Sequence, residues 1–140
     1  MATTPNSVVT VQTPKLGLAQ IATADAATFK SLYAAGANGS KIVGVLVAST
    51  DTVARVVQLA LTRGGVNYVF SAAAVPVASG TDGASPTINL LGVTLCPGLP
   101  VDNDGQPYVL LQSGDTLTIA SSTTVTSGKL LHATAIAGDF

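Results

Sequence analysis

Between Ser40 and Ala137 the chain is a succession of short runs in which apolar residues alternate with polar or small ones. Each run is closed by a cluster of Gly, Asn, Asp or Pro residues. Apolar alternation at every second residue is typical of strands that bury one face, whereas a helix needs a period of about 3.6 residues. The pattern therefore predicts an all-β chain of about eight strands, arranged as a single antiparallel β-sandwich of the jelly-roll type.

The strands are predicted from the runs that are richest in β-branched and aliphatic residues. They are residues 15–23, 41–49, 53–62, 66–73, 87–91, 108–112, 116–121 and 130–136. Gly64-Gly65 predicts a tight hairpin, because Gly readily adopts the primed turn conformations. Ser113-Gly114-Asp115 predicts a second hairpin, and residues 42–47 and 56–61 are predicted to pair as central strands of the core. Residues 25–33 fit either a short helical turn or a strand, and the strand is preferred.

Two runs show the expected alternation most clearly. The first run carries Leu16, Leu18 and, after a shift, Ile21, which suits an opening strand. In the last run Leu131, Ala133 and Ala135 form one face. The other face of that run holds Leu130, His132, Thr134 and Ile136. Each of these runs is predicted to turn one set of side chains toward the core.

The composition changes at the N-terminus. Residues 1–14 (MATTPNSVVTVQTP) contain two prolines and several Ser and Thr residues, which predicts an extended N-terminal arm. Residues 15–140 have the length of one domain, so they are predicted to form the β-sandwich. Four residues of the arm are predicted to contact a subunit by adding to a sheet edge of this or a neighbouring copy. They are Val8, Val9, Val11 and Gln12. The arm has no basic start and no apolar centre, so a secretory signal is not expected.

Charged residues make up only 9% of the chain, there is no Glu, and the formal net charge is −1. Phosphate binding needs clustered Lys and Arg, but the six basic residues are scattered, so we expect neither nucleic acid nor an anionic membrane surface as a partner. Turn residues interrupt the apolar runs too often for a membrane-spanning helix. A monomer normally keeps a densely charged surface, and large weakly polar surfaces mark contact sites. We therefore expect a homo-oligomer or a protein bound to a lattice.

Side chains that perform catalysis are scarce. His132 has no second His and no cluster of carboxylates near it in sequence, so it is predicted to be an ordinary strand residue. Asp102-Asn103-Asp104-Gly105 resembles the start of a calcium loop, but no Glu can complete it. A turn stabilised by Asx side chains is preferred, with weak calcium binding by Asp102 and Asp104 as the alternative. Cys96 is predicted to be a buried or half-buried small hydrophobe, with a bridge between subunits as the alternative. We expect no enzyme activity, cofactor or metal.

Four segments follow one another in an order that resembles a known group of proteins. They are residues 32–42 (LYAAGANGSKI), Asp51-Thr52 between two strands, Val75-Pro76, and residues 110–117 (LLQSGDTL). In this order they resemble small β-sandwich proteins of tailed bacteriophages and prophages, which serve as head decoration (cement) proteins or as tail and fibre modules. The short length, without a coiled-coil or collagen-like shaft, is closer to a decoration protein.

The resemblance implies a structural virion protein that is made in the host bacterial cytoplasm and binds the exterior of the capsid. Its partner would be the major capsid protein, and it would form a homo-oligomer such as a trimer. The contact predicted for Val8, Val9, Val11 and Gln12 would then be with the capsid or with another subunit. The resemblance carries no catalytic residues. The alternative that it leaves open is a tail or fibre module that binds a receptor.

Overall fold

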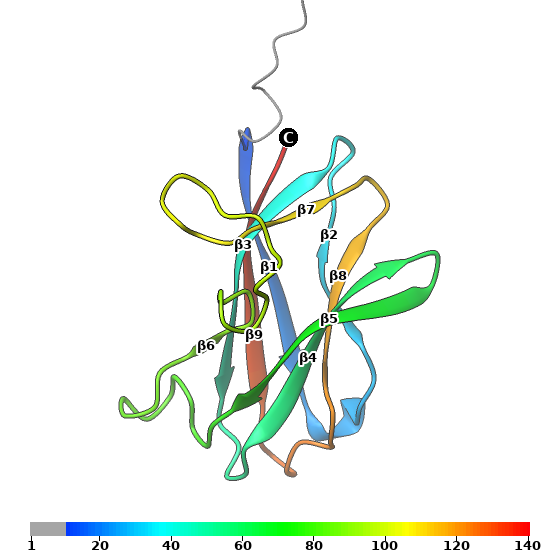
Figure 1. Cartoon of the computed structure of the whole chain (residues 1–140). Coiled ribbons are helices and arrows are strands. Elements are labelled where there is room, and N and C mark those ends of the chain that lie inside the picture. Colours follow the sequence, from blue (N-terminus) through cyan, green and yellow to red (C-terminus); the bar gives the residue numbers. More distant parts are fainter. Residues whose placement is uncertain (1–10) are drawn as a thin grey trace, which may run out of the picture.

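Two antiparallel sheets face each other in the computed structural model, which describes residues 11–140 (Figure 1). The strands are β1 Thr13–Ile21, β2 Lys30–Ala34, β3 Ser40–Ser49, β4 Arg55–Arg63, β5 Val66–Val75, β6 Ile88–Asn89, β7 Val109–Leu111, β8 Thr116–Ser121 and β9 Leu131–Asp139. The first sheet has the order β1-β9-β3-β6, with β7 also paired to β3, and the second has the order β2-β8-β4-β5. The predicted all-β sandwich is confirmed, with nine strands in place of about eight.

The strands pair as one long ribbon that folds back on itself at Gly64-Gly65. The hairpin there joins β4 to β5; outward from it, β3 pairs with β6 and β7, β2 with β8, and β1 with β9. Nested pairs distributed over two sheets in this way are the connectivity of a jelly roll. β6 and β7 pair with different parts of β3, Leu46–Val47 and Ser40–Ile42. The strand beyond the eight predicted runs is β2, which lies in the segment left open between a helical turn and a strand. Both glycines of the hairpin have positive φ angles, so the predicted turn is confirmed.

The core lies between the two sheets and is filled by alternate residues of the strands. Its fully buried aliphatic side chains include Ile21, Ile42, Val45, Val57, Leu59, Leu117, Ile119 and Leu131. On β9 the inward face is Leu131, Ala133 and Ala135, as the alternation predicts. Burying one large aliphatic side chain stabilises a fold by about 1.5–3 kcal/mol, so this layer is the main force that holds the sheets together.

Two predicted strand pairings are wrong. The turn at Gly114 does not close a hairpin, because β7 pairs with β3 in the first sheet and β8 pairs with β2 and β4 in the second. β3 and β4 also belong to different sheets, so residues 42–47 and 56–61 lie on opposite sides of the core. The same turn residues serve a hairpin and a crossing between sheets, which is why the sequence pattern did not separate the two.

In the segment 25–33 the preferred alternative, a strand, is confirmed, and the helical turn overlaps the segment only at Asp25. A single turn of 3₁₀ helix covers Thr23–Asp25, and β2 begins at Lys30. Asp25 accepts the backbone N–H of Ala22 at 2.7 Å, which ties the turn to the end of β1. The chain then crosses from the first sheet to the second.

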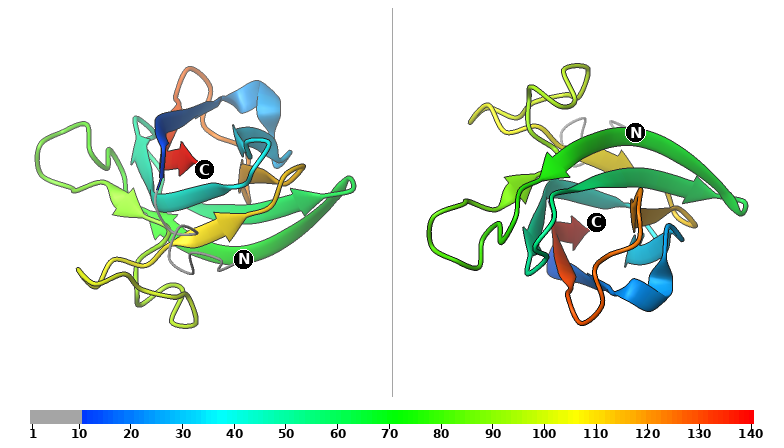
Figure 2. Two further views of the ribbon diagram at one scale, coloured as in Figure 1. Left: turned by 90° about the horizontal axis from the view of Figure 1, so that it is seen from above. Right: turned by 90° about the horizontal axis from the view of Figure 1, so that it is seen from below.

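β1 closes one side of the sandwich against β2. An added Cβ on Gly17 would collide with the backbone oxygen of Leu32, so the two strands approach as closely as glycine allows. The opposite side of the sandwich is bordered by β5 in one sheet and by β6 and β7 in the other. Figure 2 shows both layers from the two ends, with the β4–β5 hairpin extending past the body of the sandwich.

The described chain begins at Val11, so Val8 and Val9 of the predicted contact lie outside the described residues. Gln12 donates its backbone N–H to the carbonyl oxygen of Asp139 at 3.0 Å, and β1 begins at Thr13. The side chain of Val11 covers Gly138, where an added Cβ would collide with it. Because β9 turns Ala137 inward, Gly138 belongs to the outer face of the first sheet. Val11 therefore lies on that outer face.

Candidate functional site

An apolar patch lies on the outer face of the first sheet. Leu16 and Leu18 of β1 are 64% and 71% exposed, and Ile136 of β9 is 39% exposed. The register of β1 with β9 places Leu16 opposite Ile136. In the next row Leu18 lies opposite Thr134 of β9, and Thr134 in turn lies opposite the half-buried Leu46 of β3. We call Leu16, Leu18, Leu46 and Ile136 the outer patch. Large apolar side chains gathered on one exposed face mark a contact surface.

Packing of β1 explains why its leucines point outward. Alternation turns Gly17, Ala19 and Ile21 toward the inside of the sandwich. The backbone of β1 lies so close to the backbone of Leu32 that only glycine fits at position 17. If the register of β1 shifted by one residue, a leucine would take this place and collide with Leu32. The sequence pattern grouped Leu16 and Leu18 with Ile21 on one strand. The strand is confirmed, but the two leucines point away from the side that buries Ile21.

The outer patch was not predicted from the sequence, and the signal that could have indicated it is the pair of small residues at positions 17 and 19. Small side chains between large ones indicate that the small set faces a closely packed partner. In β9 the same arrangement occurs, since Ala133, Ala135 and Ala137 point inward while Ile136 points outward. The first sheet thus has an inner face of small residues along β9 and a bulkier outer face.

Ion pairs within the chain hold most of its basic side chains. Four of the six basic residues pair with an aspartate: Lys15 with Asp139, Lys30 with Asp25, Arg55 with Asp51 and Arg63 with Asp115, at N–O distances from 2.6 to 3.2 Å. Lys41 lies over the ring of Tyr108, 4.6 Å from its centre, which is a cation–π contact. Charges that are neutralised in this way leave the outer patch as a surface that can lose water at little electrostatic cost.

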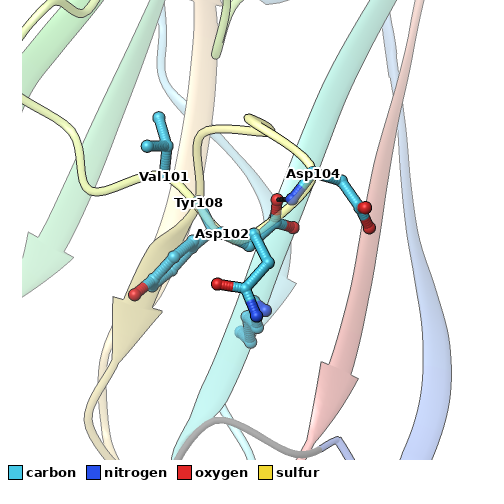
Figure 3. Close-up of a pocket in the computed structure, with 6 residues that line it drawn as sticks. Val101, Asp102, Asp104 and Tyr108 are labelled. Atoms are coloured by element: carbon cyan, nitrogen blue, oxygen red, sulfur yellow. Dashed lines mark hydrogen bonds between the residues drawn. The ribbon is translucent and has the colours of Figure 1, made fainter.

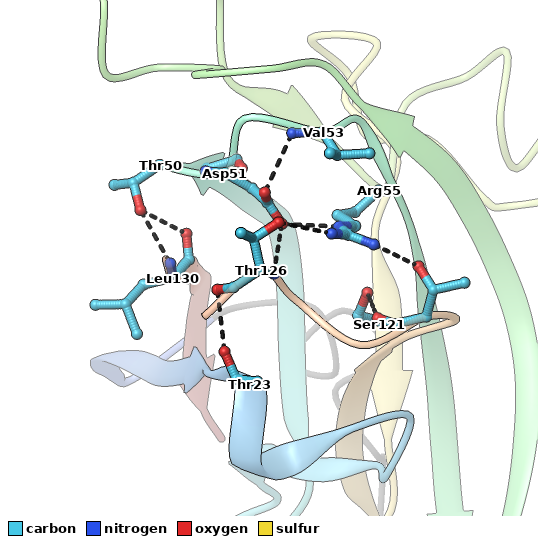
Figure 4. A network of polar contacts seen from close by, with 10 residues as sticks. Thr23, Thr50, Asp51, Val53, Arg55, Ser121, Thr126 and Leu130 are labelled. Atoms are coloured by element: carbon cyan, nitrogen blue, oxygen red, sulfur yellow. Dashed lines mark hydrogen bonds and ion pairs between the residues drawn. The ribbon is translucent and has the colours of Figure 1, made fainter. Parts of the chain in front are cut away.

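The most buried ion pair joins Asp51 to Arg55 at the end of the sandwich where β3 leads into β4 (Figure 4). The Asp51 side chain is fully buried and that of Arg55 is 13% exposed, with 2.7 Å between Nε and Oδ2. Asp51 also accepts the backbone N–H groups of Val53 and Thr126. The Arg55 guanidinium donates to the hydroxyls of Thr123 and Thr126, so this pair ties the β3–β4 turn to the segment before β9.

Hydrogen bonds hold these aspartates in their charged form. Burial alone would raise the pKa of Asp51, but hydrogen bonds from Thr126 and Arg55 outweigh it and hold that pKa well below its usual range. Hydrogen bonds from Lys15, Ser40 and Tyr33 likewise hold the pKa of Asp139 well below its usual range.

Asp115 is held in the same way near the other end of the sandwich. Two parallel hydrogen bonds from Arg63, of 2.6 and 2.7 Å, lower the pKa of Asp115 against the opposing effect of its burial. Asp115 lies in the turn between β7 and β8, and Arg63 is the last residue of β4. The pair therefore links the turn that changes sheets to the strand next to β8.

Acid is expected to destabilise the fold. A carboxyl group whose pKa is lower in the folded than in the unfolded chain contributes stability at pH values above its unfolded pKa of about 3.9. That contribution is lost as the pH falls through the folded pKa. We expect the free energy of unfolding, measured in urea, to decrease steadily below about pH 4.

A matched pair of variants tests the origin of this acid sensitivity. Asp51→Asn should weaken the pH dependence of the free energy of unfolding between about pH 4 and about pH 2, because it removes one of the carboxyl groups whose pKa is lowered by folding. Asp104→Asn is the control for the loss of one carboxylate from an exposed loop, and Asp51→Asn should weaken the pH dependence more than this control does. Equal stability at neutral pH and in strong acid would contradict the expectation.

A polar pocket of about 380 Å³ lies beside β3 at the loop that precedes β7 (Figure 3). Its lining includes Lys41, Asp102, Asp104 and Tyr108. Asp102 Oδ1 accepts the backbone N–H groups of Asp104 and Gln106, at 3.0 and 2.9 Å, which confirms the predicted Asx-stabilised turn. Residues 11–140 contain no group of three His, Cys or Asp side chains that could hold a metal ion.

His132 and Cys96 occupy the positions that their sequence context predicts. His132 is exposed on the outer face of β9, in register with Gln20 and Ala48. Cys96 is 7% exposed, and its thiol lies 3.5 Å from the carbonyl oxygen of Leu90. Within the described part of the chain, helical segments fall short of the length and apolarity that crossing a membrane requires.

No protein-family model matches the chain, and no curated protein matches it. Its function is therefore inferred from its own surface.

Proposed function

We propose that this chain is a structural protein of a bacteriophage particle, a decoration (cement) protein that binds the outer surface of the head and stabilises the lattice of the major capsid protein. The observation that carries the proposal is the outer patch. Leu16 and Leu18 are more than 60% exposed on a sheet whose other face already forms the core. Monomeric proteins rarely gather large aliphatic side chains on one exposed face, so this face is suited to another protein surface.

The distribution of charge supports the same proposal. Ion pairs within the chain neutralise Lys15, Arg55 and Arg63, so few charges must be stripped of water when the chain docks. Docking would then depend on apolar area, which adds about 25 cal/mol for each Å² removed from water. A surface of this kind fits a protein lattice better than it fits a nucleic acid or a charged substrate.

Stabilisation of a capsid follows from binding the assembled lattice alone. A ligand that binds the assembled state and not the separate subunits shifts the equilibrium toward assembly. Many equivalent sites on one head multiply a modest energy at each site, since every bound copy holds neighbouring capsid subunits together. The rigid sandwich would supply the fixed spacing that such bridging needs.

Electron cryo-microscopy of intact particles is the direct test. Density for the jelly roll on the head exterior, with the outer patch against the capsid, is the expected result. Density on the tail would support the alternative, a tail or fibre module, and particles without this chain would overturn the proposal.

A binding assay tests the surface itself. Expanded capsids that lack the chain should retain it in sedimentation, and Leu18→Asp should weaken retention at least about tenfold, as expected for a central contact residue. The matched control is Val53→Asp, which places the same charge on a residue that is 49% exposed in the β3–β4 turn. Equal retention of the two variants would exclude the outer patch as the docking surface.

A further inference from the structure

The outer edge of β5 is open next to the hairpin turn, where residues 66–69 are exposed, whereas a bulge at Phe70 and contacts of the 90–96 loop with Phe70 and Ser71 cover its middle. β5 pairs with β4 along its whole length, and within residues 11–140 no strand pairs with its other side. Its sequence, VNYVFSAAAV, holds neither a charged residue nor a proline. Natural sheets protect their edges with charges, prolines or very short strands, because an open edge is a template for another strand. The exposed end of this edge, residues 66–69, is therefore suited to accept one.

An apolar groove of about 310 Å³ lies beside this edge. Its lining consists of Leu61, Tyr68, Val69, Phe70, Leu99 and Val109. Tyr68 and Val69 are 56% and 49% exposed, and they lie in the half of β5 next to the hairpin turn, which extends past the sandwich (Figure 1). Strand addition uses both parts of such a site, since the edge supplies main-chain hydrogen bonds and the groove takes alternate side chains.

We infer that the edge of β5 and this groove accept the N-terminal segment, residues 1–10, of a second copy of this chain as an added strand. The segment has no charged side chain, and Val8 and Val9 would point to opposite sides of an added strand, so one of them would face the groove. Ten extended residues span up to about 33 Å, which is enough to reach beyond the copy that donates them.

The place where the segment joins the fold favours a neighbour's groove over the chain's own. Val11 lies on the outer face of the first sheet, at the β1 side, where it covers Gly138. The groove opens on the opposite side of the sandwich, between β5 and β7. Val11, the first described residue, therefore lies on the other side of the sandwich from the groove of the same copy. This inference goes beyond the proposed function, because it concerns contacts between copies and does not depend on what the outer patch binds.

Exchange between two defective variants provides the test, with native mass spectrometry as the measurement. The full chain, of 13.9 kDa for each copy, should be oligomeric. Deletion of residues 1–10 and the substitution Val69→Lys should each give a monomer. The deletion leaves every described strand intact, and Val69→Lys adds a charge to the groove. Mixing the two variants should restore a one-to-one heterodimer, since one has an intact groove and the other an intact segment. Val53→Lys, at an equally exposed valine, is the control and should stay oligomeric.

Three results would overturn the inference. A monomeric full chain would mean that the segment binds its own groove or none. An oligomer that survives the deletion would mean that copies pair directly, for example through their β5 edges. Variants that stay monomeric when mixed would exclude the exchange. Each of these results leaves retention by capsids through Leu18 to be measured separately, so failure here is distinguishable from failure of the proposed function.

Discussion

Replacing Arg55 by alanine is expected to lower the free energy of unfolding by about 3–5 kcal/mol, because removal of one partner leaves the buried carboxylate of Asp51 without its counter-charge. Asp51 is fully buried, and Arg55 also donates to Thr123 and Thr126. The substitution therefore detaches the β3–β4 turn from the segment before β9 as well. Chemical denaturation followed by circular dichroism measures the change.

Two further variants separate the ion pair from general effects of losing a basic side chain. Arg55→Lys keeps the positive charge but loses the planar fork that reaches Asp51 and both threonines at once, so its stability should lie between those of the unchanged chain and Arg55→Ala. Lys129→Ala removes a lysine that forms no ion pair within residues 11–140 and should change stability by no more than about 0.5 kcal/mol. An Arg55→Ala variant as stable as Lys129→Ala would show that the buried pair contributes nothing.

Leu59→Ala is expected to destabilise the fold by about 2–5 kcal/mol, the usual cost of truncating a buried leucine. Leu59 is 0% exposed at the centre of the second sheet, where it is in register with Ile119 and Ser71. The cavity left by the substitution would lie between two sheets whose backbones are fixed by hydrogen bonds, so little of it can close. Urea denaturation at neutral pH measures the loss.

Leu18→Ala is the matched control for the core substitution. Leu18 has the same side chain but is 71% exposed, so its removal should change the free energy of unfolding by no more than about 0.5 kcal/mol. Together the two variants test whether the outer patch is dispensable for folding, as a surface kept for a partner should be. A large loss of stability in Leu18→Ala would indicate that the patch is part of the fold and would weaken its assignment as a docking surface.

Local features of this protein were predictable from its sequence. The hairpin at Gly64-Gly65 was identified because two glycines fix the turn type whatever surrounds them. The last strand was identified because the alternation of Leu131, Ala133 and Ala135 reports burial directly. The Asx turn at Asp102 likewise depends only on neighbouring residues.

Non-local features were not predictable in the same way. The turn at Gly114 has the composition of a hairpin, yet the partners of β7 and β8 lie far away in the chain, so no signal within the turn distinguishes a hairpin from a change of sheet. The orientation of β1 depends on the contact of Gly17 with Leu32, which belongs to another strand. The pairs of Lys15 with Asp139 and Arg63 with Asp115 also join distant segments, whereas Arg55 and Asp51 are only four residues apart.

The candidate site follows the same division. The composition predicts a weakly charged surface. It does not predict the outer patch, because the patch depends on the orientation of β1 and on the register of β1 with β9. Of the predicted contact residues, Val11 covers Gly138 and Gln12 pairs with Asp139. Their predicted contact with another subunit or a capsid stays a prediction.

The folding of the ribbon about Gly64-Gly65 has a kinetic consequence. The hairpin can form first because its strands are adjacent in sequence, but β1 and β9 join opposite ends of the chain. Loop closure over such separations slows folding, and domains of high contact order refold on timescales of about milliseconds to seconds. We therefore expect slow refolding, with the sheet edge at β5 already formed before the two chain ends meet. During that interval a newly made copy is most prone to aggregate, so dilute conditions should raise the yield of refolded protein.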